Sequence, residues 1–270
     1  MKKFLTSLWQ VLRLPEMLIL PGNLAFFLVL SLAPLVSLFG LISSVLSLPM
    51  SSVINYINEI LPSEVVEILI GFIDGSGLNV TNIMLVIIGF MVASNGPDSL
   101  IIASNFLYKT ENKNYIYRKI KSIFITFWML ILFVIILVVL AFGSFILNKL
   151  STFDIIGNFI VNNYTIIILI KTLIAFVIIF ITIKIIYTMA PDKKIKSKYV
   201  NYGALFATIA IIVISTIYSA YVNNIAHYDI IYGSLANIII LMLLVYFISY
   251  VIILGIAINS NYYKIDSHNK

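Results

Sequence analysis

The ten residues Ile131-Leu-Phe-Val-Ile-Ile-Leu-Val-Val-Leu140 are all apolar, and they lie within a longer apolar stretch over 122–147. A helix needs roughly 20 mostly apolar residues to cross the hydrocarbon core of a bilayer. A transmembrane barrel strand would be shorter and would alternate apolar with polar residues. Only helices and closed barrels satisfy their backbone hydrogen bonds within lipid, so this stretch predicts a transmembrane helix.

The composition extends this interpretation to the whole chain. Of the 270 residues, 61% are hydrophobic and 10% are charged, against about 45–50% and 25% in a typical soluble domain. The mean hydropathy is +1.10. These values exclude a soluble enzyme, a disordered chain and a secreted disulfide scaffold, and they predict an all-α polytopic membrane protein. The predicted spans are six apolar stretches at 22–47, 82–107, 122–147, 163–188, 202–222 and 233–260.

Basic residues are sorted between alternate connections of these six spans. The regions before span 1, between spans 2 and 3, between spans 4 and 5, and after span 6 hold 15 of the 17 lysines and arginines. Loops rich in Lys and Arg stay in the cytoplasm, so both termini are predicted to be cytoplasmic. The same bias accounts for the net charge of +6 without a nucleic-acid partner. Membrane lipids are the expected partners, and the oligomeric state is not indicated.

Three segments outside the spans complete the predicted organisation around a membrane domain over 16–262. Residues 1–15 predict an amphipathic interfacial helix on the cytoplasmic side. A signal peptide is the alternative, although Arg13 and Glu16 would interrupt its apolar region. Residues 49–81 predict a pair of short extracytoplasmic helices, either a solvated hairpin or a lid. Residues 263–270 predict a cytoplasmic tail.

Span 2 contains the polar sequence Ser94-Asn95-Gly96-Pro97-Asp98-Ser99. Pro97 removes a backbone donor and Gly96 weakens the helix, so both are predicted hinge residues, together with Pro34 in span 1. An ionised Asp98 in the bilayer core would cost roughly 2.5–3.5 kcal/mol. It should therefore face protein or water, be protonated, or pair with a cation, and both Lys171 and Lys184 are candidate partners.

Polar side chains within the spans predict an inward-facing polar cavity. The alternative is that serines and threonines bond their own backbone or a neighbouring helix, that Asp98 caps the broken helix, and that Lys171 extends to the outer interface. The cavity candidates are Asn23, Ser31, Ser94, Asn95, Asp98, Asn105, Lys171, Lys184, Ser215 and Ser219.

Catalytic signals are missing from the sequence. Neither His227 nor His268 has a partner at metal-ligand spacing. There is no phosphate-binding loop, zinc-protease motif or hydrolase nucleophile motif. The sequence therefore predicts a protein that is not an enzyme, with no cofactor, no metal site and no ATP-driven pump activity.

Several motifs of this chain resemble those of the YihY/BrkB family of bacterial inner-membrane proteins, over about residues 18–262. The first two spans are similar to the family's in Leu24–Pro34 and Ser94–Tyr108. The C-terminal motif residues are Tyr187, Pro191, Gly203, Tyr232, Gly233, Ser234, Gly255 and Asn259.

The resemblance implies six spans, an inner-membrane location and a role in transport or in the cell envelope. Family members often carry an acidic residue where this chain has Ala257, so a proton- or cation-carrying role for that carboxylate is excluded here. Some members are labelled ribonuclease BN. Nothing in this sequence supports that label, because nuclease chemistry needs a hydrated and usually metal-bound site.

Two functions follow from the sequence. The first is a transporter or flippase-like exporter that moves a lipid or amphipathic substrate through the polar cavity. The alternative is a non-transporting membrane scaffold in envelope assembly.

Overall fold

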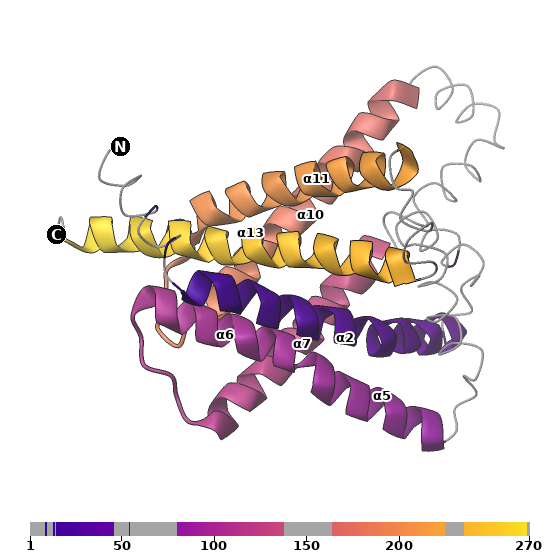
Figure 1. Ribbon diagram of the computed structural model, residues 1–270, viewed down its shortest axis with the longest axis horizontal. Helices are drawn as coiled ribbons and strands as arrows, with labels where there is room; N and C mark the ends of the chain where they lie inside the picture. Colours follow the sequence, from indigo (N-terminus) through magenta and orange to yellow (C-terminus); the bar gives the residue numbers. More distant parts are fainter. Residues whose placement is uncertain are drawn as a thin grey trace.

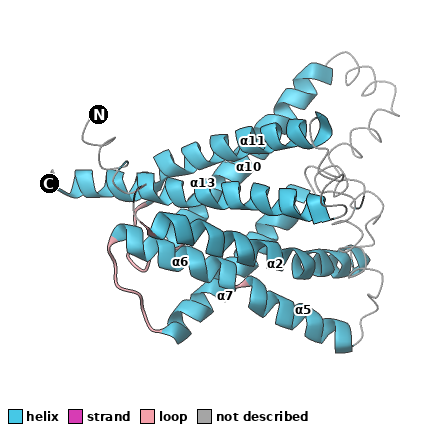
Figure 2. Ribbon diagram, in the orientation of Figure 1, coloured by secondary structure: helices cyan, strands magenta, loops and turns pink. Residues whose placement is uncertain are grey.

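The computed structural model describes residues 15–45, 80–137, 164–224 and 235–268, together with Trp9, Arg13 and Ile54. Within these ranges the chain is helical and contains no strand, which confirms the all-α prediction there (Figures 1 and 2). The elements are α2 (Glu16–Val45), α5 (Val80–Ala93), α6 (Asn95–Tyr108), α7 (Tyr115–Leu137), α10 (Tyr164–Met189), the 3-10 helix η2 (Ser197–Val200), α11 (Asn201–Asn224) and α13 (Leu235–His268).

Each predicted apolar stretch coincides with described helical residues, and the second stretch is divided between α5 and α6. Four described segments are long and apolar enough to cross a membrane; they are Ile87–Tyr108, Thr172–Met189, Ser197–Tyr218 and Ile239–Ile265. The count of six spans stays a prediction.

The predicted segments 1–15 and 49–81 lie almost wholly outside the described residues, as do Tyr232, Gly233 and Ser234. Near the N-terminus, the guanidinium of Arg13 lies 5.1 Å from the centre of the Trp9 ring, in a cation–π contact. The predicted tail is not marked by a helix end, because α13 continues to His268. Its 34 residues rise about 51 Å, more than the roughly 30 Å of a bilayer core.

Helix α13 lies at the centre of the bundle and contacts α2, α6 and α11 (Figure 1). Helix α10 packs on α11 and α7, and α7 packs on α6. The loops 109–114 and 190–196 come together with the last turns of α13 at one end of the bundle. We call this the basic end, because both loops carry several lysines.

Helices α11 and α13 approach each other closely at two glycines. The backbone N–H of Gly203 donates to Asn259 Oδ1 at 2.7 Å. A Cβ on Gly203 would overlap the carbonyl oxygen of Gly255, and a Cβ on Gly255 would overlap the Tyr187 hydroxyl. Lipid tails are as apolar as the helices themselves, so membrane helices associate through close packing at small residues. Four residues of the C-terminal sequence motif therefore form one helix crossing.

The helix of span 2 breaks at Ser94, two residues before the predicted hinge. Hydrogen bonding continues through the break, because Ser94 N–H donates to Phe90 O at 3.0 Å and Asp98 N–H donates to Ser94 O at 3.1 Å. Pro97 lies in the first turn of α6, where a backbone N–H has no partner within the helix, so its missing donor costs little. By contrast, α2 is helical without interruption through Pro34. The structure thus has no break at the second predicted hinge, because membrane helices tolerate proline where neighbouring groups satisfy the backbone.

Gly203→Ala should destabilise the protein by about 1–3 kcal/mol, because the added methyl group forces α11 and α13 apart. The free energy of unfolding in detergent micelles, measured by denaturant titration, tests this. Gly22→Ala is the matched control, since a Cβ on Gly22 meets nothing within 4 Å. It should be neutral or stabilising by up to about 1 kcal/mol. Equal effects of the two substitutions would contradict the packing role of Gly203.

Candidate functional site

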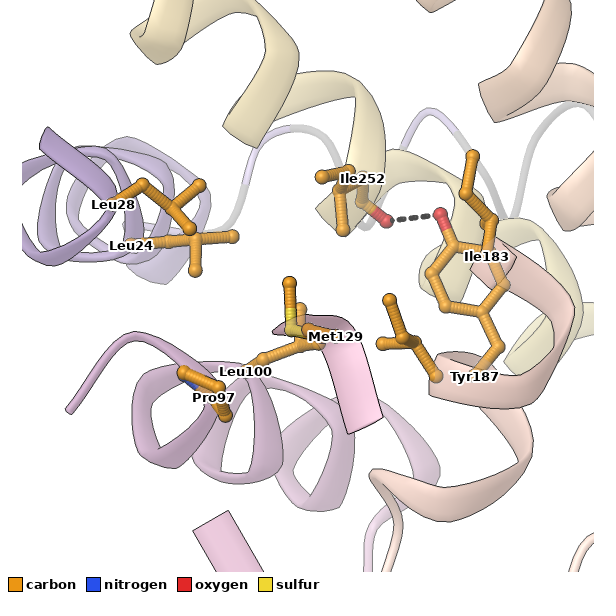
Figure 3. A pocket seen from close by; sticks show the side chains of 9 residues that line it. Leu24, Leu28, Pro97, Leu100, Met129, Ile183, Tyr187 and Ile252 are labelled. Carbon is orange, nitrogen blue, oxygen red and sulfur yellow. Dashed lines mark hydrogen bonds between the residues drawn. The ribbon is translucent and has the colours of Figure 1, made fainter. Parts of the chain in front are cut away.

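A small cavity lies where five helices meet (Figure 3). Its volume is about 30 Å³, enough for one or two water-sized groups. Tyr187 is the one lining residue with a polar side-chain group, and its hydroxyl donates to Ile252 O at 2.7 Å, as the dashed line in Figure 3 shows. The lining residues are Leu24, Leu28, Pro97, Leu100, Met129, Ile183, Ile186, Tyr187 and Ile252.

This lining differs from that of the polar cavity expected from the sequence, which stays a prediction. Pro97 is the one predicted site residue among the cavity's lining residues, and the remainder of the lining is apolar apart from the Tyr187 hydroxyl. The predicted polar side chains instead bond to backbone or to charged groups, because an unsatisfied polar group is costly in an apolar interior.

A larger apolar groove, of about 310 Å³, lies between α11 and α13. Tyr218 lines it, and its hydroxyl is buried without a hydrogen-bond partner among the described residues. The other lining residues are Ile214, Ile217, Tyr221, Leu243, Leu244 and Phe247.

Asp98 pairs with Arg118 of α7, and no ion pair joins it to Lys184, the candidate partner whose side chain the structure describes. Arg118 Nε lies 2.6 Å from Asp98 Oδ1, and the two side chains are 18% and 15% exposed. Asp98 also lies in the first turn of α6, where the helix dipole favours a negative charge. A cation and a helix N-terminus together hold this carboxylate within the bundle.

Lys119, the next residue of α7, bridges the helix break. Its ammonium group donates to Asn95 Oδ1 at 2.7 Å and to Met91 O at 3.3 Å. Met91 belongs to α5 and Asn95 to α6, so one side chain holds both sides of the break. Arg118 and Lys119 thus attach the broken helix to α7.

Asn105 lies fully buried at the basic end and connects α6 with the loop after α10. Its Nδ2 donates to Asp192 Oδ2 at 2.7 Å and to Asn112 Oδ1 at 2.9 Å, and its Oδ1 accepts from the Asp192 N–H at 2.7 Å. Lys121 Nζ lies 2.7 Å from Asp192 Oδ1. It also donates to the carbonyl oxygens of Ala190 and Pro191 at 2.9 and 3.0 Å. Two loops and two helices are therefore joined by one polar network.

The pKa of Asp192 is lowered within this network. Burial alone would raise it, but the hydrogen bonds from Lys121 and Asn105, the charge of Lys121 and the Lys113 N–H together outweigh the burial. The carboxylate side chain is 1% exposed, so it acts as the buried anion that fixes the basic end.

The other predicted site residues do not meet at one place. Ser31 and Ser94 donate to carbonyl oxygens of their own helices, Leu28 O and Met91 O. Asn23 is exposed on α2 and Ser215 is half-buried on α11. The Lys184 ammonium group lies 5.9 Å from the centre of the Phe180 ring. The side chains of Lys171 and Ser219 lie outside the described part of the structure.

Sequence reasoning missed Arg118, Lys119, Lys121 and Asp192 as site residues. The three cations were interpreted only as topology signals. One signal was available for Asp192, because it is the single acidic residue in the strongly basic segment from 191 to 198. For Arg118, the spacing of 20 residues across a turn gave no local pattern.

The helical bundle and its apolar, membrane-spanning segments define a multi-pass membrane protein. The family model described as "Virulence factor BrkB" matches residues 9–269, and the chain belongs to this family. No solved structure matches the chain.

Two relatives cover most of the chain. A protein of Bacillus subtilis (strain 168), YfkH, whose name calls it ribonuclease-like, is 30% identical over 97% of this chain and 95% of its own length. A UPF0761 membrane protein of Aeromonas salmonicida (strain A449) is 26% identical over 93% of this chain and 86% of its own length. A UPF0761 membrane protein of Alteromonas mediterranea is 37% identical over 26% of this chain and 24% of its own length.

Asp98→Asn and Arg118→Gln should each destabilise the protein, because each leaves the other charge without its partner. The double variant should lose less than the sum, with a coupling of roughly 0.5–3 kcal/mol. The free energies of unfolding of the four proteins in detergent give this coupling. Lys196 is an exposed lysine in the loop 190–196, so Lys196→Gln controls for the loss of a positive charge. A coupling near zero would contradict the pair.

Asp192→Asn should lower the melting temperature at neutral pH and have less effect in acid. The folded-state pKa of Asp192 lies below its unfolded value, which is about 3.9. Its stabilisation is therefore complete above about pH 4 and is lost as the pH falls through the folded-state pKa. Melting curves of wild type and variant from pH 7 to pH 3 test this, and a difference that stays constant over the range would contradict it.

Proposed function

We propose that the protein moves a lipid or another amphipathic molecule, as a transporter or flippase-like exporter. The observation that carries the proposal is the apolar cavity between α2, α6, α7, α10 and α13, whose lining includes Pro97, three residues after the break at Ser94. An apolar cavity suits the hydrocarbon part of an amphiphile better than an ion or a sugar.

The separation of apolar from charged groups supports an amphipathic substrate. The cavity lining is apolar, whereas Lys121 bonds to Asp192 at the basic end, and Arg118 and Lys119 bond to residues beside the helix break. A hydrocarbon chain in the cavity would have cationic groups near its polar head. The groove between α11 and α13 offers a further apolar surface of the size of part of an acyl chain.

Transport requires the cavity to widen, because about 30 Å³ does not admit a hydrocarbon chain. The break at Ser94 is the hinge we propose for this change. Pro97 follows the break and lines the cavity, so a rotation of α5 against α6 would alter the cavity wall. Lys119 holds both sides of the break and would control the opening.

The proposed membrane arrangement follows the distribution of Lys and Arg. In it the chain crosses a bacterial inner membrane six times, with the basic end and both termini in the cytoplasm. We further propose that the protein is not an enzyme. The ribonuclease-like name belongs to the Bacillus subtilis relative, and this sequence carries no nuclease motif.

A membrane scaffold in envelope assembly is the second candidate function. The bonding of the polar side chains favours it, because Asn95, Asp98 and Asn105 all bond to partners within the chain. Such bonding holds a fixed structure together and needs no substrate.

Leu28→Phe should abolish lipid movement by filling the cavity, whereas Leu30→Phe should leave it unchanged. Leu28 lines the cavity, and Leu30 is 42% exposed on the same helix, so the pair is matched in chemistry and position. The assay reconstitutes the full chain in liposomes with NBD-labelled phospholipid. It measures the fraction of label that external dithionite reduces with time.

The expected result is lipid movement above that of protein-free liposomes in wild type and Leu30→Phe, and none in Leu28→Phe. Equal melting temperatures of the two variants would show that the loss is not a folding defect. Absence of movement in wild type for zwitterionic and anionic labels alike would reject the transporter, and a protein copurifying at fixed stoichiometry would then support the scaffold.

A further inference from the structure

Tyrosines from four elements pack together at the basic end. The rings of Tyr108 and Tyr263 lie 6.0 Å apart between centres, those of Tyr199 and Tyr263 5.2 Å, and those of Tyr202 and Tyr262 4.9 Å. Edge-to-face geometry predominates, which is the favoured arrangement of aromatic pairs. These rings join the end of α6, η2, the start of α11 and the last turns of α13.

Lysines surround these rings. The Lys193 ammonium group lies 4.9 Å from the centre of the Tyr263 ring, and that of Lys198 lies 4.5 Å from the centre of the Tyr199 ring. Lys264 donates to Leu107 O at 3.1 Å. Lys109 lies near enough for its positive charge to repel that of Lys264. We call the tyrosines and these lysines the tyrosine–lysine cluster.

The backbone fixes the position of Lys109. It adopts a left-handed conformation, with φ 53°, at the C-terminal cap of α6. Its N–H and that of Thr110 donate to the Phe106 and Asn105 carbonyl oxygens at 3.1 and 2.8 Å. This cap places a cation beside Lys264 at the cost of an uncommon backbone conformation for a residue with a side chain.

Lysines outnumber acidic residues in the two loops of the basic end, which carry Glu111 and Asp192 against Lys109, Lys113, Lys193, Lys194 and Lys196. The two described salt bridges join Asp98 to Arg118 and Asp192 to Lys121, and neither involves Lys109 or Lys193. Both of these lysines are exposed. The Tyr108 hydroxyl is buried with no hydrogen-bond partner among the described residues. Like charges held together in this way attract an anion.

The position of the cluster indicates which anion. The membrane-crossing segments Ile87–Tyr108 and Ile239–Ile265 end within it, and Ser197–Tyr218 begins within it. Tyrosine is enriched where membrane helices meet the headgroup layer, and basic residues at this depth attract anionic lipids. We propose that the tyrosine–lysine cluster binds the phosphate of an anionic phospholipid in the leaflet at the basic end, with Lys109 and Lys193 as its direct ligands.

This site does not depend on the proposed transport, because a lipid bound here could stabilise a transporter or a scaffold. The test titrates the purified full chain with phosphatidylglycerol or phosphatidylcholine of identical acyl chains and counts bound lipids by native mass spectrometry. Wild type should bind phosphatidylglycerol in clear preference. The double variant Lys109→Gln, Lys193→Gln should lose that preference by about tenfold or more, since each lysine near an anionic headgroup contributes appreciably.

The double variant Lys194→Gln, Lys196→Gln is the matched control. It removes the same charge from exposed positions of the same loop and should stay within about twofold of wild type. Lys109→Arg with Lys193→Arg should keep the preference, which separates charge from folding. Equal losses in the two glutamine variants, or no preference in wild type, would overturn the proposal. Competition by inorganic phosphate at low millimolar concentration would assign the site to a soluble anion and overturn it equally.

Discussion

The contact between Gly203 and Gly255 is the constraint on which the rest of the bundle depends. It brings the backbones of α11 and α13 together, and α13 in turn contacts α2 and α6. Asn259 of α13 accepts from the Gly203 N–H of α11, and the Tyr187 hydroxyl of α10 donates to the Ile252 carbonyl of α13, so hydrogen bonds join α13 to both α11 and α10. In lipid there is no hydrophobic force between helices, so packing and such bonds supply the association. The cavity lies beside this crossing because Tyr187 and Ile252 also form part of its lining.

The polar groups at the basic end stabilise the structure in a second way, by fixing the positions of the loops. Asn105 and Lys121 turn a loop that carries Asp192 into a rigid connection between α6, α7 and α10. A carboxylate that is 1% exposed is tolerable only when it accepts several hydrogen bonds and faces a cation. The loop positions are therefore fixed by electrostatics, while the interior of the bundle is fixed by shape. This division explains why the cavity is apolar although charged residues lie within a few turns of it.

Local sequence patterns predicted the features that depend on neighbouring residues in the chain, namely the helices and one helix break. The apolar stretches gave the helices, and Gly96 with Pro97 gave a break that the structure has at Ser94. Pro34 gave no break, because its effect depends on neighbouring helices that one sequence does not reveal. The partner of Asp98 was beyond prediction for the same reason, since Arg118 belongs to a group of basic residues whose sequence pattern reports only topology. The polar cavity stays a prediction, because helical spacing places Ser94, Asn95 and Asp98 on one side of a helix without telling what that side faces. In the structure it faces cations of α7.

The sequence separation of three contacts bears on how the chain enters the membrane during its synthesis. Asp98 and Arg118 are separated by 20 residues and belong to consecutive helices joined by a short connection. Loop closure over so short a distance is inexpensive, so the pair forms as soon as this helical hairpin exists. The acidic residue of span 2 is thereby neutralised before α10, α11 and α13 have been made. Asp192 meets Asn105 across 87 residues, so that contact requires α10 and the loop after it. Gly203 meets Asn259 across 56 residues, so that contact requires α13.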